Sequence, residues 1–201
     1  MLKIHLQIEK IDYETCMEEL LPKLMESWSK KQTPSDLENF VLQLGANAVP
    51  AAKSVLSYMD VDQRDQIMVR MIGKHEEKLT EKANRSLEKR IPGAVKIGGL
   101  LAEDQEGAKV GLTARDVSVD YAKLLEAPAI KNAVEQMGLL KGPAKLALQM
   151  GANLSPDVME KMGVTLLNSE AVKPKLLGVL SDALAQAGLA VTLSDLMVEN
   201  V

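Results

Sequence analysis

The sequence is poor in the residues that most often mark a chemically active or disulfide-bonded protein. Its 201 residues include one cysteine, two histidines, one Phe, one Trp and three Tyr. The single Cys16 excludes an intramolecular disulfide, and no cysteines and histidines have the spacing of a zinc site. Few aromatic rings are available to stack on nucleic-acid bases. These absences argue against a disulfide scaffold and a zinc module.

Charge and hydrophobic patterning restrict the class of protein further. The chain carries 24 Lys and Arg against 28 Asp and Glu, a net charge of -4 without a long basic run. This balance lacks the positive surface of a general nucleic-acid binder. No apolar run approaches the roughly 18 to 20 residues needed to span a bilayer, and the N-terminus is unlike a signal peptide. We therefore predict a cytoplasmic protein with no transmembrane segment and no nucleic-acid partner.

A weak internal repeat is the most informative pattern in the sequence. Three short matches occur in the same order in both halves: Ile11-Asp12-Tyr13 with Val119-Asp120-Tyr121, 42–47 with 148–153, and 95–103 with 191–199. Self-similarity of this kind indicates tandem copies of one structural unit. The sequence thus predicts two repeats, 1–106 and 107–201, that form one compact pseudo-symmetric unit.

Each repeat is expected to contain a strand, several helices and a closing strand. Leu2, Ile4, Leu6 and Ile8 alternate with polar residues, which is typical of a half-buried strand. Helices are then expected from Asp12, from a Thr33 cap followed by Pro34, near 49–58, and from about 60 to 90 without a break. Val95–Glu103 closes the repeat as a strand.

The second repeat has its own signals for the same elements. A strand is expected around 110–114, a helix from Asp120, and a closing strand at 189–199. Pro174 is expected to offset or kink the last helical region, and Gly188 to end it.

The junction of the repeats suggests how the strands pair. Residues 104–107 form a loop of hairpin length, so we expect a central antiparallel hairpin at 95–116. A pseudo-two-fold axis would then pair the last strand with the first. The predicted fold is α+β, with a small, mainly antiparallel four-stranded sheet and two sets of helices packed on it. Two helical lobes sharing the sheet are the alternative.

No residue stands out as catalytic. His75 falls near an apolar stripe, which favours a structural position, and His5 lies on the polar face of the first strand, as a solvated side chain would. Cys16 sits among apolar residues, where a thiol usually behaves as a small hydrophobe. Gly98-Gly99 is typical of a bulge or a close backbone approach. We predict no catalytic residue, no metal site and no cofactor.

The repeated Leu-Gln-[Leu/Met]-Gly-Ala-Asn is the most specific motif. Its structural interpretation is a helix that ends at Gly and a next helix that is capped by Asn. This interpretation explains the glutamine less well. If the two corners meet near the pseudo-two-fold axis, amide groups would converge on a polar ligand. The predicted ligand-binding residues are Gln43, Asn47, Gln149 and Asn153.

These observations favour a non-enzymatic binding or protein-interaction module, built as a fused pseudo-dimer. Its partner, a protein or a small ligand, is not specified by the sequence, and a homodimer is possible. Eleven methionines against so few aromatics suggest a first alternative, a carrier of an apolar ligand in a Met- and Leu-lined helical groove, although core filling explains them as well. The second alternative is an enzyme of unfamiliar type that uses carboxylates with Tyr13, Tyr121 or His75.

Overall fold

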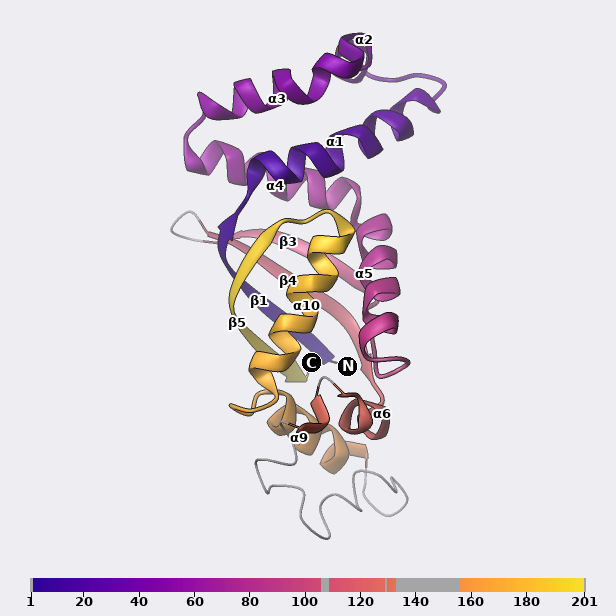
Figure 1. The fold of residues 1–201 in the computed structure, drawn as a ribbon, viewed down its shortest axis with the longest axis vertical. Helices are drawn as coiled ribbons and strands as arrows, with labels where there is room; N and C mark the ends of the chain where they lie inside the picture. Colours follow the sequence, from indigo (N-terminus) through magenta and orange to yellow (C-terminus); the bar gives the residue numbers. More distant parts are fainter. Residues whose placement is uncertain (1, 106–108, 129, 133–155, 201) are drawn as a thin grey trace.

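The computed structural model describes residues 2–105, 109–128, 130–132 and 156–200, which form an α+β fold (Figure 1). The elements before the central loop are β1 (Leu2–Ile11), α1 (Tyr13–Ser29), α2 (Asp36–Leu44), η1 (Gly45–Asn47), α3 (Ala48–Ser57), α4 (Val61–Lys74), α5 (Glu76–Arg90), β2 (Val95–Lys96) and β3 (Gly99–Gln105). The elements after it are β4 (Lys109–Val119), α6 (Tyr121–Glu126), α9 (Pro156–Leu167), α10 (Lys173–Ala187) and β5 (Val191–Asn200). No described helix is long and apolar enough to cross a membrane.

The sheet is antiparallel throughout its described pairs. Its long strands follow the order β3-β4-β1-β5, and the short β2 pairs with the end of β4. The hairpin predicted around 95–116 is the β3–β4 pair, in which Leu101 lies opposite Thr113. The first and last strands pair as expected, so the two ends of the chain lie close together (Figure 1). The sheet has five strands rather than the predicted four, because the backbone leaves the ladder at 97–98 and separates β2 from β3.

One face of the sheet forms the main core. Leu2, Ile4, Leu6 and Ile8 of β1 are buried, as the alternation predicts, whereas Gln7 is exposed on the other face. α10 packs on β5, α4 and α5 pack on β3, and α5 and α10 pack against each other. α2, η1 and α3, which we call the arm, lie at the far end from α6 and α9 and pack on α1 (Figure 1).

The prediction of one continuous helix from 60 to 90 is wrong, because the helix breaks at its centre. His75 has φ −123° and ψ 15°, which ends α4 and precedes α5. The break lets α4 lie beside the arm while α5 runs along the sheet (Figure 1). The three- and four-residue spacing of apolar residues continues through the break, so spacing alone could not reveal it.

Two predicted helix starts also need correction. The cap of α2 is Ser35, not Thr33: Ser35 accepts a hydrogen bond from the Glu38 amide, and the Glu38 carboxylate accepts one from the Ser35 amide. Pro34 therefore precedes the helix. Pro174 lies in the first turn of α10, where a missing N–H costs nothing, and so it opens this helix instead of kinking it. Gly188 ends α10 with φ 104°, as predicted.

The Gly98-Gly99 pair makes the close approach that the sequence suggested. A Cβ atom on Gly98 would lie 2.6 Å from the Cβ atom of Asp116, a residue of β4 with φ 51°. At Gly99 a Cβ atom would lie 2.5 Å from the Glu76 carboxylate, which binds the Arg115 guanidinium. A side chain at Gly98 would therefore push against β4, and one at Gly99 would displace the joint between α5 and the sheet.

Candidate functional site

Only half of the predicted amide site lies within the described residues. Gln43 and Asn47 are both exposed, at the corner between α2 and α3. Gln149 and Asn153 lie outside the described residues, so the meeting of the two corners stays a prediction. Gly45 ends α2 with φ 54°, as expected. The Asn47 side chain makes no capping hydrogen bond, because a 3-10 turn already carries the chain into α3 in a helical conformation.

Neither histidine fits its sequence interpretation completely, because His5 has hydrogen-bond partners and a ring nitrogen of His75 lacks one. His5 is not simply solvated, because its Nε2 lies 2.8 Å from the Glu199 carboxylate and its Nδ1 lies 3.2 Å from the Thr113 hydroxyl. These bonds connect three neighbouring strands, β4, β1 and the edge strand β5, on the polar face of the sheet. His75 is partly buried, as its apolar neighbours suggested, but its Nε2 atom has no hydrogen-bond partner among the described residues.

The potential nucleophiles and bases are not activated. Burial raises the pKa of the Cys16 thiol to about 11, so the neutral thiol predominates at pH 7. Burial, followed by a hydrogen bond to Asp65, raises the pKa of Tyr13 well above its ordinary value. Within the part of the chain that the structure describes, no three His, Cys, Asp or Glu side chains are grouped as metal ligands.

Tyr13 joins the sheet to the helices at the end of β1. Its hydroxyl donates a hydrogen bond to the buried carboxylate of Asp65 in α4. The Arg64 guanidinium carbon lies 5.8 Å from the centre of the Tyr13 ring, and Arg64 Nε donates to the Met59 carbonyl at 3.0 Å. Open hollows of about 610 and 560 Å³ flank this joint. The bonded side chains hold α1 against α4, which is a structural task.

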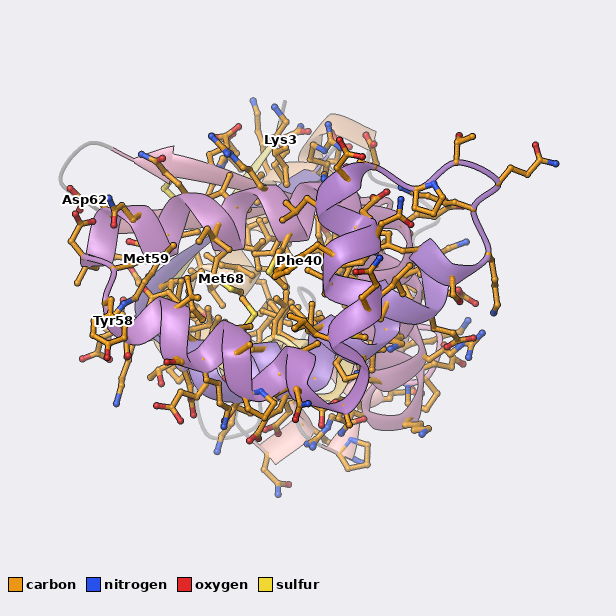
Figure 2. All side chains as sticks on the ribbon, turned by 90° about the horizontal axis from the view of Figure 1, so that it is seen from above. Lys3, Phe40, Tyr58, Met59, Asp62 and Met68 are labelled. Carbon is orange, nitrogen blue, oxygen red and sulfur yellow. The ribbon has the colours of Figure 1, made fainter. Side chains whose placement is uncertain are left out.

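The arm carries most of the exposed apolar side chains. Of the large apolar residues that are exposed in the described structure, all but Met197 lie between 37 and 61. We call these five the arm surface: Leu37 (71% exposed), Phe40 (59%), Val55 (54%), Tyr58 (89%) and Val61 (54%). In Figure 2, which looks down on the arm, Phe40 projects from α2 towards the centre of the view, and Tyr58 lies beyond the end of α3.

The arm surface is exposed because the arm packs on one side only. A small second core, formed by Leu21 and Leu24 of α1 and Ala48 of α3, is flanked by the half-buried Val41 and Leu44. Leu37, Phe40, Val41 and Leu44 are three and four residues apart, so they form one apolar stripe along α2. The small core half-buries Val41 and Leu44 at one end of this stripe, and Leu37 and Phe40 at the other end stay exposed.

The charges left unpaired around the arm surface are mainly acidic. Lys31 binds Glu38 at 2.6 Å, and Lys53 binds Glu18 of α1, so both lysines are already neutralised. No ion pair is found among the described residues for Asp36, Asp60 or Asp62. Asp62 lies near Tyr58 and Met59 at the start of α4 (Figure 2). The apolar side chains are thus bordered by carboxylates.

Sequence reasoning did not identify the arm surface. The available signal was the segment Asp-Leu-Glu-Asn-Phe-Val-Leu-Gln-Leu of α2, with apolar residues at 37, 40, 41, 42 and 44. Four of these positions, 37, 40, 41 and 44, form one stripe, which is the ordinary pattern of a helix that faces a core. The spacing alone therefore does not show that part of the stripe is exposed, and the packing on α1 decides which part is covered.

The chain matches none of the protein-family models, and comparison with curated proteins and with solved structures finds no match. The geometry of the site alone therefore bears on the function of the chain.

Proposed function

We propose that the chain is a non-enzymatic protein-interaction module, and that the arm surface binds an amphipathic helix with basic residues beside its apolar face. The observation that carries the proposal is the concentration of exposed apolar side chains on α2, α3 and the first residue of α4. Single exposed apolar residues are normal on a soluble protein, whereas their gathering on one element is typical of an interaction site.

The chemistry of the partner follows from the carboxylates around the surface. Asp36, Asp60 and Asp62 favour lysine or arginine on the partner and disfavour an acidic one. Burial of a fully exposed Phe or Tyr side chain contributes about 1.5 to 3 kcal/mol. Of these two anchors, Phe40 lies on α2 and Tyr58 directly follows the last residue of α3, and a helix several turns long would contact both.

We also propose that 1–106 and 107–201 are a fused pseudo-dimer. The strand order β3-β4-β1-β5 supports this, since exchanging β1 with β4 and β3 with β5 leaves the pairing unchanged. Asp12 and Asp120 each follow a strand and accept a hydrogen bond from the amide three residues later. In this proposal the amide groups of Gln43 and Asn47 add polar contacts at the edge of the arm surface.

The two alternatives have less support from the geometry. Met68 is fully buried, and Met59, Met71 and Met162 pack against the main core, which favours core filling. The apolar recess lined by Leu20, Leu24 and Leu79 has a volume of about 30 Å³, far below the roughly 300 Å³ of a small-ligand pocket. An enzyme would need an activated group. Burial and then neighbouring lysines, not acids, lower the pKa of His75.

The test is binding of a labelled amphipathic peptide of about 20 residues, long enough to form a helix. Two versions share a Leu face and carry Lys or Glu flanks, and a third has the composition of the Lys version in scrambled order, without the Leu face. Fluorescence anisotropy is measured with the full chain and with Phe40→Ser, Tyr58→Ser and the double variant. Met197→Ser is the control, because Met197 is also an exposed apolar residue (53%) but lies on β5.

We expect the Lys-flanked peptide to bind most tightly and each arm substitution to weaken it about tenfold, while Met197→Ser has no effect. The substituted residues are exposed, so stability changes stay within about 0.5 kcal/mol, which a urea titration checks. Equal binding by all variants, or no binding of any peptide, contradicts the proposal. Self-association that Phe40→Ser abolishes would make a second copy the occupant and would also overturn it.

A further inference from the structure

A second surface, on α1 and α5, has the opposite charge. Lys23 of α1, Lys78 and Lys82 of α5, and His75 between α4 and α5 line one shallow recess of about 30 Å³. We call these four residues the lysine cluster. The floor of the recess is apolar and includes Leu20, Leu24 and Leu79. The cluster lies outside the arm surface.

The charges of the lysine cluster are not balanced by the acids of α5. Glu76 binds Arg115, Glu81 binds Arg85, and the Glu88 carboxylate accepts a hydrogen bond from the Gly93 amide. Glu76, Glu81 and Glu88 are thus bound to partners outside the recess, and Glu77 has no ion pair among the described residues. Among the described residues, Lys78 and Lys82 have no ion pair.

The nearest acids on α1 are also occupied. Glu19 binds Lys23 at 2.8 Å, and Glu26 binds Lys30 at 2.6 Å. The C-terminal end of α10 at Ala187 contributes a partial negative charge of only about half an electron. Two full positive charges, those of Lys78 and Lys82, therefore meet little opposite charge.

The electrostatic cost of this arrangement is visible in the lysine cluster itself. Burial and then the neighbouring Lys23 lower the pKa of Lys82. Burial, followed by Lys78, Lys74 and Lys31, lowers the pKa of His75. Like charges at i and i+4, as at Lys78 and Lys82, also destabilise a helix. A bound anion would offset the repulsion between the lysines. It would also supply the hydrogen-bond partner that His75 Nε2 lacks.

We propose that the lysine cluster binds the doubly charged phosphate group of a phosphate monoester. Lysine ammonium groups are point-charge donors suited to phosphate oxygens, and the recess is large enough for part of one phosphate group but not for a nucleoside. The remainder of the ligand extends into solvent. Free phosphate metabolites and the head group of phosphatidic acid share this chemistry.

The experiment is an NMR titration of the full chain with inorganic phosphate, at constant ionic strength set by sodium chloride. Amide signals of α1 and α5 and the ring protons of His75 report on the cluster. The same titration is made on Lys78→Gln/Lys82→Gln and on Lys89→Gln, which removes an exposed lysine of α5 outside the cluster.

We expect saturable shifts at the cluster below about 10 mM phosphate, an affinity at least about tenfold weaker in the double variant, and less than a twofold change in Lys89→Gln. Equal shifts with chloride alone, equal affinity in the double variant, or no saturable shift overturns the proposal. Co-sedimentation with phosphatidic acid vesicles, but not phosphatidylcholine vesicles, that the double variant loses would identify a lipid source. Phosphate binding without vesicle binding would identify a free phosphate ester.

Discussion

The arm and the rest of the described chain, which we call the body, differ in how completely they bury their apolar residues. In the body, β1, β3 and β4 are covered by α4, α5 and α10, and large side chains such as Leu100 and Leu112 are completely buried. In the arm, a core of three residues is shared with α1, while Leu37, Phe40 and Tyr58 remain exposed. The body thus finds its packing partners within the chain, whereas the arm leaves large apolar side chains uncovered by the described residues, which supports the proposed interaction site. Four predictions test this contrast.

The largest effect should come from matched Leu→Ala substitutions in the two cores. Leu112 and Leu24 are both buried, so the chemical change is the same. Leu112→Ala leaves a cavity in the rigid main core and should lower the free energy of unfolding by about 3 to 5 kcal/mol. Leu24→Ala should cost about 2 to 3 kcal/mol and mainly increase hydrogen exchange in α2 and α3. Urea titration and hydrogen exchange distinguish the two, and equal exchange throughout both variants would contradict the contrast.

Loss of the Tyr13 hydroxyl should loosen the joint between α1 and α4. Tyr13→Phe leaves the buried Asp65 carboxylate without its donor, which should cost about 1 to 3 kcal/mol of stability. Tyr121→Phe is the matched control, because the Tyr121 hydroxyl has no hydrogen-bond partner among the described residues. Thermal unfolding of both variants should show a loss in the first and little change in the second. Equal losses would mean that the Asp65 bond adds no stability.

Stabilising the body alone should leave the arm unaffected. Gly178 lies in the interior of α10, and nothing within 4 Å would contact an added Cβ atom. Gly178→Ala should therefore raise the free energy of unfolding by about 0.5 to 1 kcal/mol. Hydrogen exchange of α2 and α3 should not slow, since their opening does not involve α10. Slower exchange in the arm would show that arm and body open together.

Acid should loosen the arm before the body. Hydrogen bonds from Lys31 and from the Ser35 amide lower the pKa of Glu38 below its ordinary 4.5. A carboxylate with a lowered pKa stabilises the folded state above pH 4.5, and this contribution is lost as the pH falls below that value. Hydrogen exchange at the start of α2 should accelerate there, and less so in Glu38→Gln. A rise in α2 protection on acidification would contradict the prediction.

The local signals in the sequence predicted much of the body. The alternation at 2–8 identified β1 and its buried face, the loop at 104–107 led to the hairpin, and Gly188 marked the end of α10. These features depend on neighbours in the sequence. The break at His75 could not be predicted in this way, because it follows from how α4 and α5 meet different parts of the sheet. The arm surface was missed for the same reason.

The sequence by itself determined the strands, most helix ends and the division of apolar and polar residues. Their causes are local, since side-chain alternation, caps and backbone freedom act over a few residues. Only the tertiary structure decided which part of the apolar stripe of α2 is left exposed and that Tyr13 meets Asp65. It also decided that lysines from α1 and α5 gather around His75. Such contacts join residues far apart in the chain, and they depend on the angles at which whole elements pack.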